Sequence, residues 1–364
     1  MSKVNISNEL IKRDFFKWLK EAKGNCDSSV NNIEKAILKY ESFTNYALFS
    51  TYDREVAIEF KKWLKNNKYK GKTIAISTYH TYMRYLRTFF TWLAGQPIYR
   101  NKISLDSVEY LNVQDKEEKM ARQQIPRKYP DLDYILKLTD SINVSNEIDL
   151  RDKALISFTA LSGMRDKAII TLPLSNFDTE NFVIYQNPKK GVQTKFSKYI
   201  YSILFKFDEK LVENVTKWID HLKSKNYNES NPLFPRSKTK QDSKNPSFDS
   251  STEIEPKYWS HAGAMRKIFK DRCLIADLEY YPPHTYRHFT IDIALKHCKN
   301  GEQIKAVSQN FGHENVGTTL GSYANFEPNR LSEVLNSINF SQNTENTDSE
   351  LIEQILNLIK NWEK

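Results

Sequence analysis

Cysteine, glycine and proline are all scarce in this chain, which contains 3, 10 and 12 of them among 364 residues. The cysteines lie far apart and form no CxxC pair, so the sequence supports neither a disulfide framework nor a zinc ribbon. So little glycine and proline excludes collagen-like and linker-dominated chains. No apolar run approaches the roughly 20 residues that span a bilayer, and the N-terminus lacks the apolar segment of a signal peptide. We therefore expect a cytoplasmic protein with reduced thiols and no membrane partner.

Apolar side chains and positive charge are plentiful. Apolar residues make up 39% of the chain and aromatic residues 13%, which is enough for sizeable cores, and a chain of this length usually forms two domains. The formal net charge is +9 and the isoelectric point is near 9.1. Such an excess favours a polyanionic partner, nucleic acid before membrane, because neutralising phosphates dominates nonspecific affinity.

The first third of the chain has the period of amphipathic helices. One apolar face within residues 77–95 consists of Tyr79, Tyr82, Met83, Leu86, Phe90 and Leu93. We interpret this face as core. The opposite face carries Thr81, Arg84, Thr88 and Thr91, with Arg87 beside it. This polar face is either a solvated surface or a helix presented to a DNA groove.

Composition also divides the chain. Residues 114–130 are charged without apolar periodicity and are expected to form an interdomain linker. Short β-branched and aromatic runs within 180–201 flank NPKKGVQT and indicate an antiparallel hairpin. The polar segment 235–256 is expected to be an exposed loop. The resulting fold class is mainly α with a small antiparallel β-sheet, an α+β arrangement. We divide it into an N-terminal amphipathic helix (1–24), a helical domain (25–113), the linker, a domain at 131–340, and a polar tether plus C-terminal helix (341–364).

The stretch PPHTYRHFTID, residues 282–292, gathers His284, Arg287 and His288 within about one helical turn. A metal site, a phosphate clamp and an ordinary helix start are the competing interpretations. The i,i+4 histidines resemble a zinc-binding helix, but Thr285 stands where such a motif has glutamate. The arginine would also repel a cation at close range. We therefore expect no metal, and the choice between clamp and helix start depends on residues elsewhere.

Similar residues occur in three other places. Arg165 follows a Ser-Gly break, lysines crowd the hairpin turn, and FGHENVGTTLGSY contains His313 and Tyr323. This set has many donors, one possible nucleophile and few carboxylates, so it suits metal-free phosphoryl transfer rather than two-metal hydrolysis. Arginines would neutralise the non-bridging oxygens, a tyrosine would hold the phosphate covalently, and a lysine or histidine would protonate the departing oxygen.

The order and local sequence of these motifs resemble the tyrosine recombinases, the phage integrase family. The resemblance runs over residues 128–340 through the motifs LSGMR, a Lys-Gly hairpin turn, HTYR, FGH and TTLGSY. It implies that residues 25–113 bind the DNA core site and that the two domains clamp the duplex. The residues that match the family's active site are Arg165, Lys190, His284, Arg287, His313 and Tyr323. Lys189 and Lys195 remain alternatives to Lys190.

Three departures from the family pattern stand out. The family commonly has an acidic residue three positions after its first arginine, where this chain has Ala168, and Asp166 is a possible substitute. His313 and Tyr323 are ten residues apart, a spacing that some mobile-element integrases share. A separate arm-site-binding domain is not expected before the core-binding region.

The resemblance predicts a site-specific recombinase, an integrase or transposase of a mobile element. It implies a 3′-phosphotyrosyl intermediate without metal or ATP, double-stranded DNA as partner, and a tetramer on paired sites assembled through the C-terminal helix. Arg84 and Arg87 are candidate DNA contacts. We expect the enzyme near the nucleoid of a bacterial or archaeal cell. The alternatives are a type IB-like topoisomerase and, outside the enzymes, a DNA-binding regulator with a decayed site.

Overall fold

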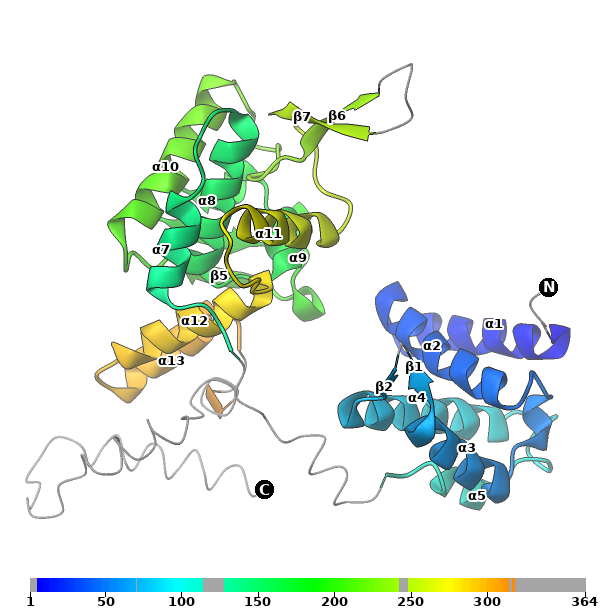
Figure 1. The fold of residues 1–364 in the computed structure, drawn as a ribbon. Coiled ribbons are helices and arrows are strands. Elements are labelled where there is room, and N and C mark those ends of the chain that lie inside the picture. The colour runs from blue at the N-terminus through cyan, green and yellow to red at the C-terminus, as the bar shows by residue number, and fades with distance from the viewer. Residues whose placement is uncertain (1–4, 70, 114–127, 242–247, 314–315, 318–364) are drawn as a thin grey trace, which may run out of the picture. The chain divides into compact units, whose positions relative to one another are not determined.

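The computed structural model describes residues 5–69, 71–113, 128–241, 248–313, 316 and 317. The chain divides into two compact units, Met1–Ile125 and Pro126–Lys364. The fold is mainly helical with small antiparallel sheets, as expected from the sequence (Figure 1). Most of the expected linker, and all of the expected C-terminal tether and helix, lie outside the described residues. None of the described helices is both long and apolar enough to cross a membrane.

The first unit is built from helices whose apolar faces converge on one aromatic core. Its elements are α1 (Ile6–Glu21), α2 (Asp27–Phe43), the 3₁₀ turn Phe49–Thr51, α3 (Arg54–Asn66), the short strands β1 (Lys68–Tyr69) and β2 (Lys72–Thr73), α4 (Ile76–Ala94) and α5 (Leu105–Glu109). The expected core face of α4 is confirmed, because Tyr79, Met83, Leu86, Phe90 and Leu93 are buried and Tyr82 is partly buried against the same core.

Helix α1 is joined to α2 by buried polar contacts as well as by apolar packing. Lys12 is 3% exposed and its ammonium lies 2.8 Å from the carboxylate of the fully buried Glu41. Asn8 donates to the same carboxylate at 3.2 Å and to the carbonyl of Ala47 at 2.9 Å. Buried charges are tolerated only when they are paired and hydrogen-bonded, and this pair meets that condition.

The second unit surrounds the buried helix α8. Its helices are α7 (Leu132–Asp140), α8 (Glu147–Ser162), α9 (Asp166–Ile170), α10 (Glu209–Ser224), α11 (Gly263–Ile275), α12 (Pro283–Lys296) and α13 (Gly301–Asn310). Helices α7, α10 and α12 pack against α8, which explains why α8 is buried on almost every side. A helix in the middle of a unit has no solvent face, so its sequence shows little amphipathic pattern.

A three-stranded antiparallel sheet lies beside this helical core, with the order β3 (Phe177–Asp178), β4 (Val183–Gln186), β5 (Ile200–Ile203). The expected hairpin is confirmed: Val183 pairs with Ile203 and Gln186 with Ile200. Its second strand begins later than the sequence pattern suggested. Phe196 and Ser197 adopt positive φ angles of 60° and 50°, which no regular strand allows. The connection therefore extends over residues 187–199.

A polar ribbon projects from the second unit (Figure 1). It consists of β6 (Ser237–Gln241) paired with β7 (Phe248–Ile254). The expectation of an exposed loop at 235–256 was wrong. Residues 237–254 lack the apolar alternation that marks a strand with one buried face, so no strand was predicted there.

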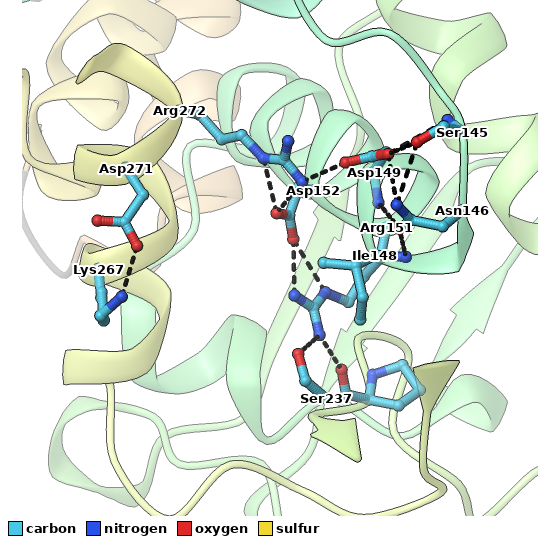
Figure 2. Close-up of polar contacts among 11 residues, drawn as sticks. Ser145, Asn146, Ile148, Asp149, Arg151, Asp152, Ser237, Lys267, Asp271 and Arg272 are labelled. Carbon is cyan, nitrogen blue, oxygen red and sulfur yellow. Dashed lines mark hydrogen bonds and ion pairs between the residues drawn. The ribbon is translucent and has the colours of Figure 1, made fainter. Parts of the chain in front are cut away.

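The base of this ribbon is held by charged side chains of α8 (Figure 2). Arg151 donates to the carbonyl of Pro235 at 3.1 Å and to the hydroxyl of Ser237 at 3.0 Å. Asp152 accepts from both Arg151 and Arg272, at 2.7 Å each. Arg272 also lies 2.7 Å from Asp149. Two arginines and two aspartates thus tie α8, α11 and the ribbon into one unit.

Candidate active site

The first site arginine follows a backbone reversal at the end of α8. Gly163 has a φ of +55°, and a Cβ there would lie 2.5 Å from the ring of Phe311. Glycine is therefore needed both for the left-handed turn and for the close approach. Arg165 comes two residues later, as the N-cap of α9, and is half-buried. The Ser-Gly break noted in the sequence thus fixes where the Arg165 backbone lies.

The second site arginine is buried in the first turns of α12. Arg287 is 3% exposed. Its guanidinium donates to the carbonyl of Gly163 at 2.9 Å and to that of Phe311 at 2.7 Å. A third contact joins Arg287 Nη2 to His313 Nε2 at 2.9 Å. One side chain therefore connects the SGMR, HTYR and FGH segments, of which the first lies more than a hundred residues from the other two in the sequence.

His313 is positioned by the turn that ends α13. Its backbone N–H donates to the carbonyl of Ser308 at 3.0 Å. The preceding Gly312 has a φ of +65°, and a Cβ there would lie 2.4 Å from the side chain of Ile200 in β5. The glycine of the FGH motif therefore allows the histidine turn to lie directly against the sheet.

The electrostatic field at His313 is positive. Burial, followed by the charges of Arg287, Arg165 and Lys195, lowers the pKa of His313 to about 4. Because a guanidinium has no acceptor, Nε2 must accept from Arg287, and the proton of the neutral ring must then lie on Nδ1. The site is thus suited to receive an anion and unsuited to hold another cation.

The two histidines of the α12 start occupy different environments. His284 is exposed, and its ring packs edge-on against that of His288 with centroids 5.4 Å apart. His288 is half-buried and also stacks on Tyr129, 6.3 Å away. His284 and Arg287 are three residues apart on one helix, so they share a face. The described residues contain no group of three His, Cys, Asp or Glu side chains arranged to hold a metal ion.

The lysines of the hairpin lie on the connection between β4 and β5. Lys189, Lys190 and Lys195 are exposed. Of these, Lys195 is the one whose charge contributes to the lowered pKa of His313. The structure therefore brings Lys195 into electrostatic range of the arginine cluster, while Lys190 is the last residue of a 3₁₀ turn that is capped by Gly191.

The acidic residue beside Arg165 is paired in a way that the sequence did not reveal. Asp166 is 6% exposed, and Arg266 of α11 donates to its carboxylate at 3.0 Å. Ala168, at the position where related sequences carry an acid, is 1% exposed and belongs to the apolar core. The Asp166–Arg266 pair joins residues a hundred positions apart, so no local spacing could have signalled it.

The remaining candidates lie elsewhere. Arg84 and Arg87 are exposed on α4 of the first unit. Arg87 pairs with Glu109 at 2.8 Å, and the guanidinium of Arg84 lies over the ring of Tyr85. Tyr323 lies outside the described residues. The structure thus brings Arg165, Arg287 and His313 together, with Lys195 nearby and His284 on the same helix face as Arg287.

Comparisons with known proteins agree on one family and one fold. The model of the phage integrase family matches residues 130–330. The chain is 23% identical over 317 residues to the tyrosine recombinase XerD of Listeria monocytogenes serotype 4b (strain F2365), covering 86% of this chain and 92% of XerD.

Two solved structures show a similar fold. A lambda integrase dimer bound to a COC′ core site matches with a TM-score of 0.59 and 13% identity, over 86% of this chain and 94% of that one. The Tn1549 transposon integrase in complex with transposon right end DNA matches with a TM-score of 0.56 and 15% identity, over 90% and 98%.

Proposed function

The chain belongs to the phage integrase family of tyrosine recombinases, enzymes that cleave and rejoin DNA, and on this premise we propose that it is the site-specific recombinase of a mobile element. Its role would be that of an integrase or transposase. The observation that carries this proposal is the convergence of Arg165, Arg287 and His313 in a positive field.

We assign the chemical roles as follows. The phenolic oxygen of Tyr323 attacks the scissile phosphorus and forms a 3′-phosphotyrosyl bond, while the bond from phosphorus to the 5′ oxygen breaks and the phenolic proton passes to solvent. Arg165 and Arg287 stabilise the added negative charge on the non-bridging oxygens, and His284 and His313 donate further hydrogen bonds. Because the phosphotyrosyl bond retains the energy of the phosphodiester, rejoining needs neither ATP nor a metal.

A lysine of the β4–β5 connection supplies the proton to the leaving 5′ oxygen. Lys190 is favoured by its Lys-Gly turn, whereas Lys195 is favoured by its charge effect on His313. Alanine substitutions at Lys189, Lys190 and Lys195, compared on the same DNA, identify the donor as the one whose loss slows cleavage most.

The partner is double-stranded DNA. Residues 25–113 form the domain that binds the core site, with Arg84 and Arg87 on the exposed face of α4 contacting the duplex. Residues 131–340 form the catalytic domain, and the recombinase assembles as a tetramer on paired sites. The C-terminal segment 341–364 docks on a neighbouring subunit, so deletion of residues 349–364 should weaken assembly and spare simple DNA binding. The enzyme acts in the cytoplasm, at the nucleoid.

A nicked suicide substrate tests the cleavage step. Wild-type protein should form a covalent adduct whose DNA carries a free 5′-hydroxyl, and Tyr323→Phe should form none. Tyr199→Phe, which alters an exposed tyrosine of the β4–β5 connection, is the matched control and should still form the adduct. No wild-type adduct on cognate DNA at low salt would instead indicate a DNA-binding regulator.

Strand exchange separates the recombinase from a type IB-like topoisomerase. A recombinase joins ends from two different sites and yields recombinant products on a substrate that carries both. Relaxation of supercoiled DNA without recombinant products would favour the topoisomerase.

A further inference from the structure

The last residue of α13 is hydrogen-bonded to the backbone of the hairpin. Ile203 donates its N–H to Asn310 Oδ1 at 2.6 Å, and Asn310 Nδ2 donates to the carbonyl of Ile203 at 3.1 Å. Among the described strands, β5 lies at the edge of its sheet and pairs with β4 on one side. The Asn310 amide therefore offers the strand edge the donor and acceptor that a further strand would offer.

A second hydrogen-bonded chain ties the same residue to both strands. The hydroxyl of Ser202 donates to the backbone carbonyl of Asn310 at 2.8 Å, and Gln186 of β4 donates to Ser202 Oγ at 2.8 Å. Ser202 is 1% exposed and Gln186 5%, so these polar groups depend on one another for satisfaction. The contacts of Asn310 thus extend across β5 to β4.

These contacts join two segments that are proposed to act on one phosphate, the turn that carries His313 and the hairpin that carries the candidate lysines. Asn310 is three residues before His313, whose imidazole contacts Arg287. Strands β4 and β5 frame the connection 187–199, which carries every candidate lysine. Whichever lysine donates the proton, its connection leads directly into strand β5, which Asn310 holds to the His313 turn through Ser202 and Ile203.

The connection 187–199, which we call the lysine connection, contains two residues in a strained backbone conformation. Phe196 and Ser197 both have positive φ, a region that costs a non-glycine residue roughly 1 kcal/mol or more. At its other side, the N–H of Gln193 donates to Thr171 Oγ1 at 2.8 Å, just after α9. The connection is thus held directly at Gln193, and strand β5, which begins where the connection ends, is held to Asn310 at Ser202 and Ile203.

We propose that Asn310 is a positioning residue for the cleavage reaction, which fixes the lysine connection relative to His313 and Arg287. This inference rests on the proposed function. In the cleavage step the bond from phosphorus to the 5′ oxygen breaks as the tyrosyl oxygen bonds to phosphorus, and the lysine ammonium gives its proton to the departing oxygen. A displaced connection would leave phosphate binding intact and deprive the leaving oxygen of its proton.

A sulfur-substituted DNA separates this role from a general effect on folding. One suicide substrate carries the natural 5′ bridging oxygen at the scissile phosphate, and the other carries sulfur there. Sulfur leaves as a thiolate, which needs no proton because thiols have a pKa near 8.5, far below that of an alcohol. The loss of a general acid therefore slows the oxygen substrate selectively.

The variants are Asn310→Leu, which removes both side-chain hydrogen bonds and keeps the branched shape, and Asn310→Asp, which keeps an acceptor for Ile203. Gln309→Ala, at an exposed amide of the same helix, is the matched control. We expect Asn310→Leu to slow single-turnover cleavage of the oxygen substrate by about 10²-fold, at the lower end of general-acid effects. The sulfur substrate should change by less than about 3-fold, and Asn310→Asp should be intermediate. The adduct amplitude on the sulfur substrate counts folded, DNA-bound enzyme and so corrects the rates for any unfolded fraction.

Equal slowing on both substrates, or no slowing on either, would overturn the positioning role while the wild-type adduct still supported the proposed function. Failure of the wild type to form any adduct would overturn both.

Discussion

Two clusters in the second unit are built on buried arginines, and they treat the positive charge in opposite ways. Near the start of α8, Arg151 and Arg272 donate to the carboxylates of Asp149 and Asp152, so two positive charges meet two negative ones (Figure 2). Beyond the end of the same helix, Arg287 donates to two carbonyls and an imidazole, all uncharged acceptors.

This difference distinguishes a cluster that supports the structure from one that is suited to catalysis. The first cluster balances its charge within the protein and connects three elements. The second places its positive charge beside His313, whose pKa is lowered first by burial and then by the neighbouring cations. The two lie about 16 Å apart along α8, far enough for substitutions in one to leave the other largely unaffected.

The largest expected effect comes from substituting Arg287, the buried arginine of the candidate active site. Arg287→Lys keeps the charge but loses the planar fork that contacts Gly163, Phe311 and His313. Adduct formation should fall by about 10²–10³-fold, the usual effect of removing one transition-state donor. Single-turnover cleavage per folded molecule measures this effect. If Arg287→Lys lowered the melting temperature but left the cleavage rate unchanged, the two clusters would not differ in function as proposed.

The balanced cluster should show the reverse behaviour. Asp152→Ala leaves two arginines without their shared carboxylate, and breaking a buried ion pair in this way costs about 3–5 kcal/mol of unfolding free energy. Chemical denaturation measures the loss. Lys267 and Asp271 form an exposed pair on α11, so Asp271→Ala is a control expected to cost less than about 1 kcal/mol. Cleavage per folded molecule should stay within about 3-fold of wild type in both variants.

Two glycines test whether the close approach of the His313 turn to strand β5 matters for stability. Gly312 and Gly24 have nearly equal φ angles, +65° and +66°, but a Cβ meets Ile200 at the first and open space at the second. Gly24→Ala should cost about 1–2 kcal/mol from backbone strain alone. Gly312→Ala should cost about 1–3 kcal/mol more from crowding. In the double variant Gly312→Ala/Ile200→Ala the smaller side chain should relieve the crowding. Equal losses of unfolding free energy for Gly24→Ala and Gly312→Ala would show that the close approach is unimportant.

The smallest effect is a pH dependence of stability. The pKa of His313 is about 4 in the folded protein, below its ordinary value of 6.5. As pH falls from 6.5 to 4 the unfolded chain takes up the proton first, so the contribution of His313 is complete above pH 6.5 and is lost toward pH 4. His313→Gln should lose this dependence, which we expect to be on the order of 1–2 kcal/mol for a half-buried group. Denaturation curves at pH 4.5 and 7 measure it, and identical pH responses of wild type and variant would contradict the lowered pKa of His313.

The sequence was informative where motifs are local and silent where contacts join distant segments. LSGMR, HTYR and FGH identified Arg165, Arg287 and His313 as a candidate set, and the structure brings these three together. The pairing of Asp166 with Arg266, and of Asp152 with Arg272, spans a hundred residues or more and leaves no periodic trace. Strand β5 begins after a connection that is held by Thr171 and contains two residues with positive φ, so its start was not readable from propensity.

The most direct test of the central claim is to map the residue that becomes linked to DNA. The suicide-substrate adduct would be digested with protease and nuclease, and the nucleotide-bearing peptide sequenced by mass spectrometry. The account predicts a phosphonucleotide on Tyr323 in the wild type and its absence in Tyr323→Phe. A DNA link on any other residue, or an adduct that persists in Tyr323→Phe, would contradict it.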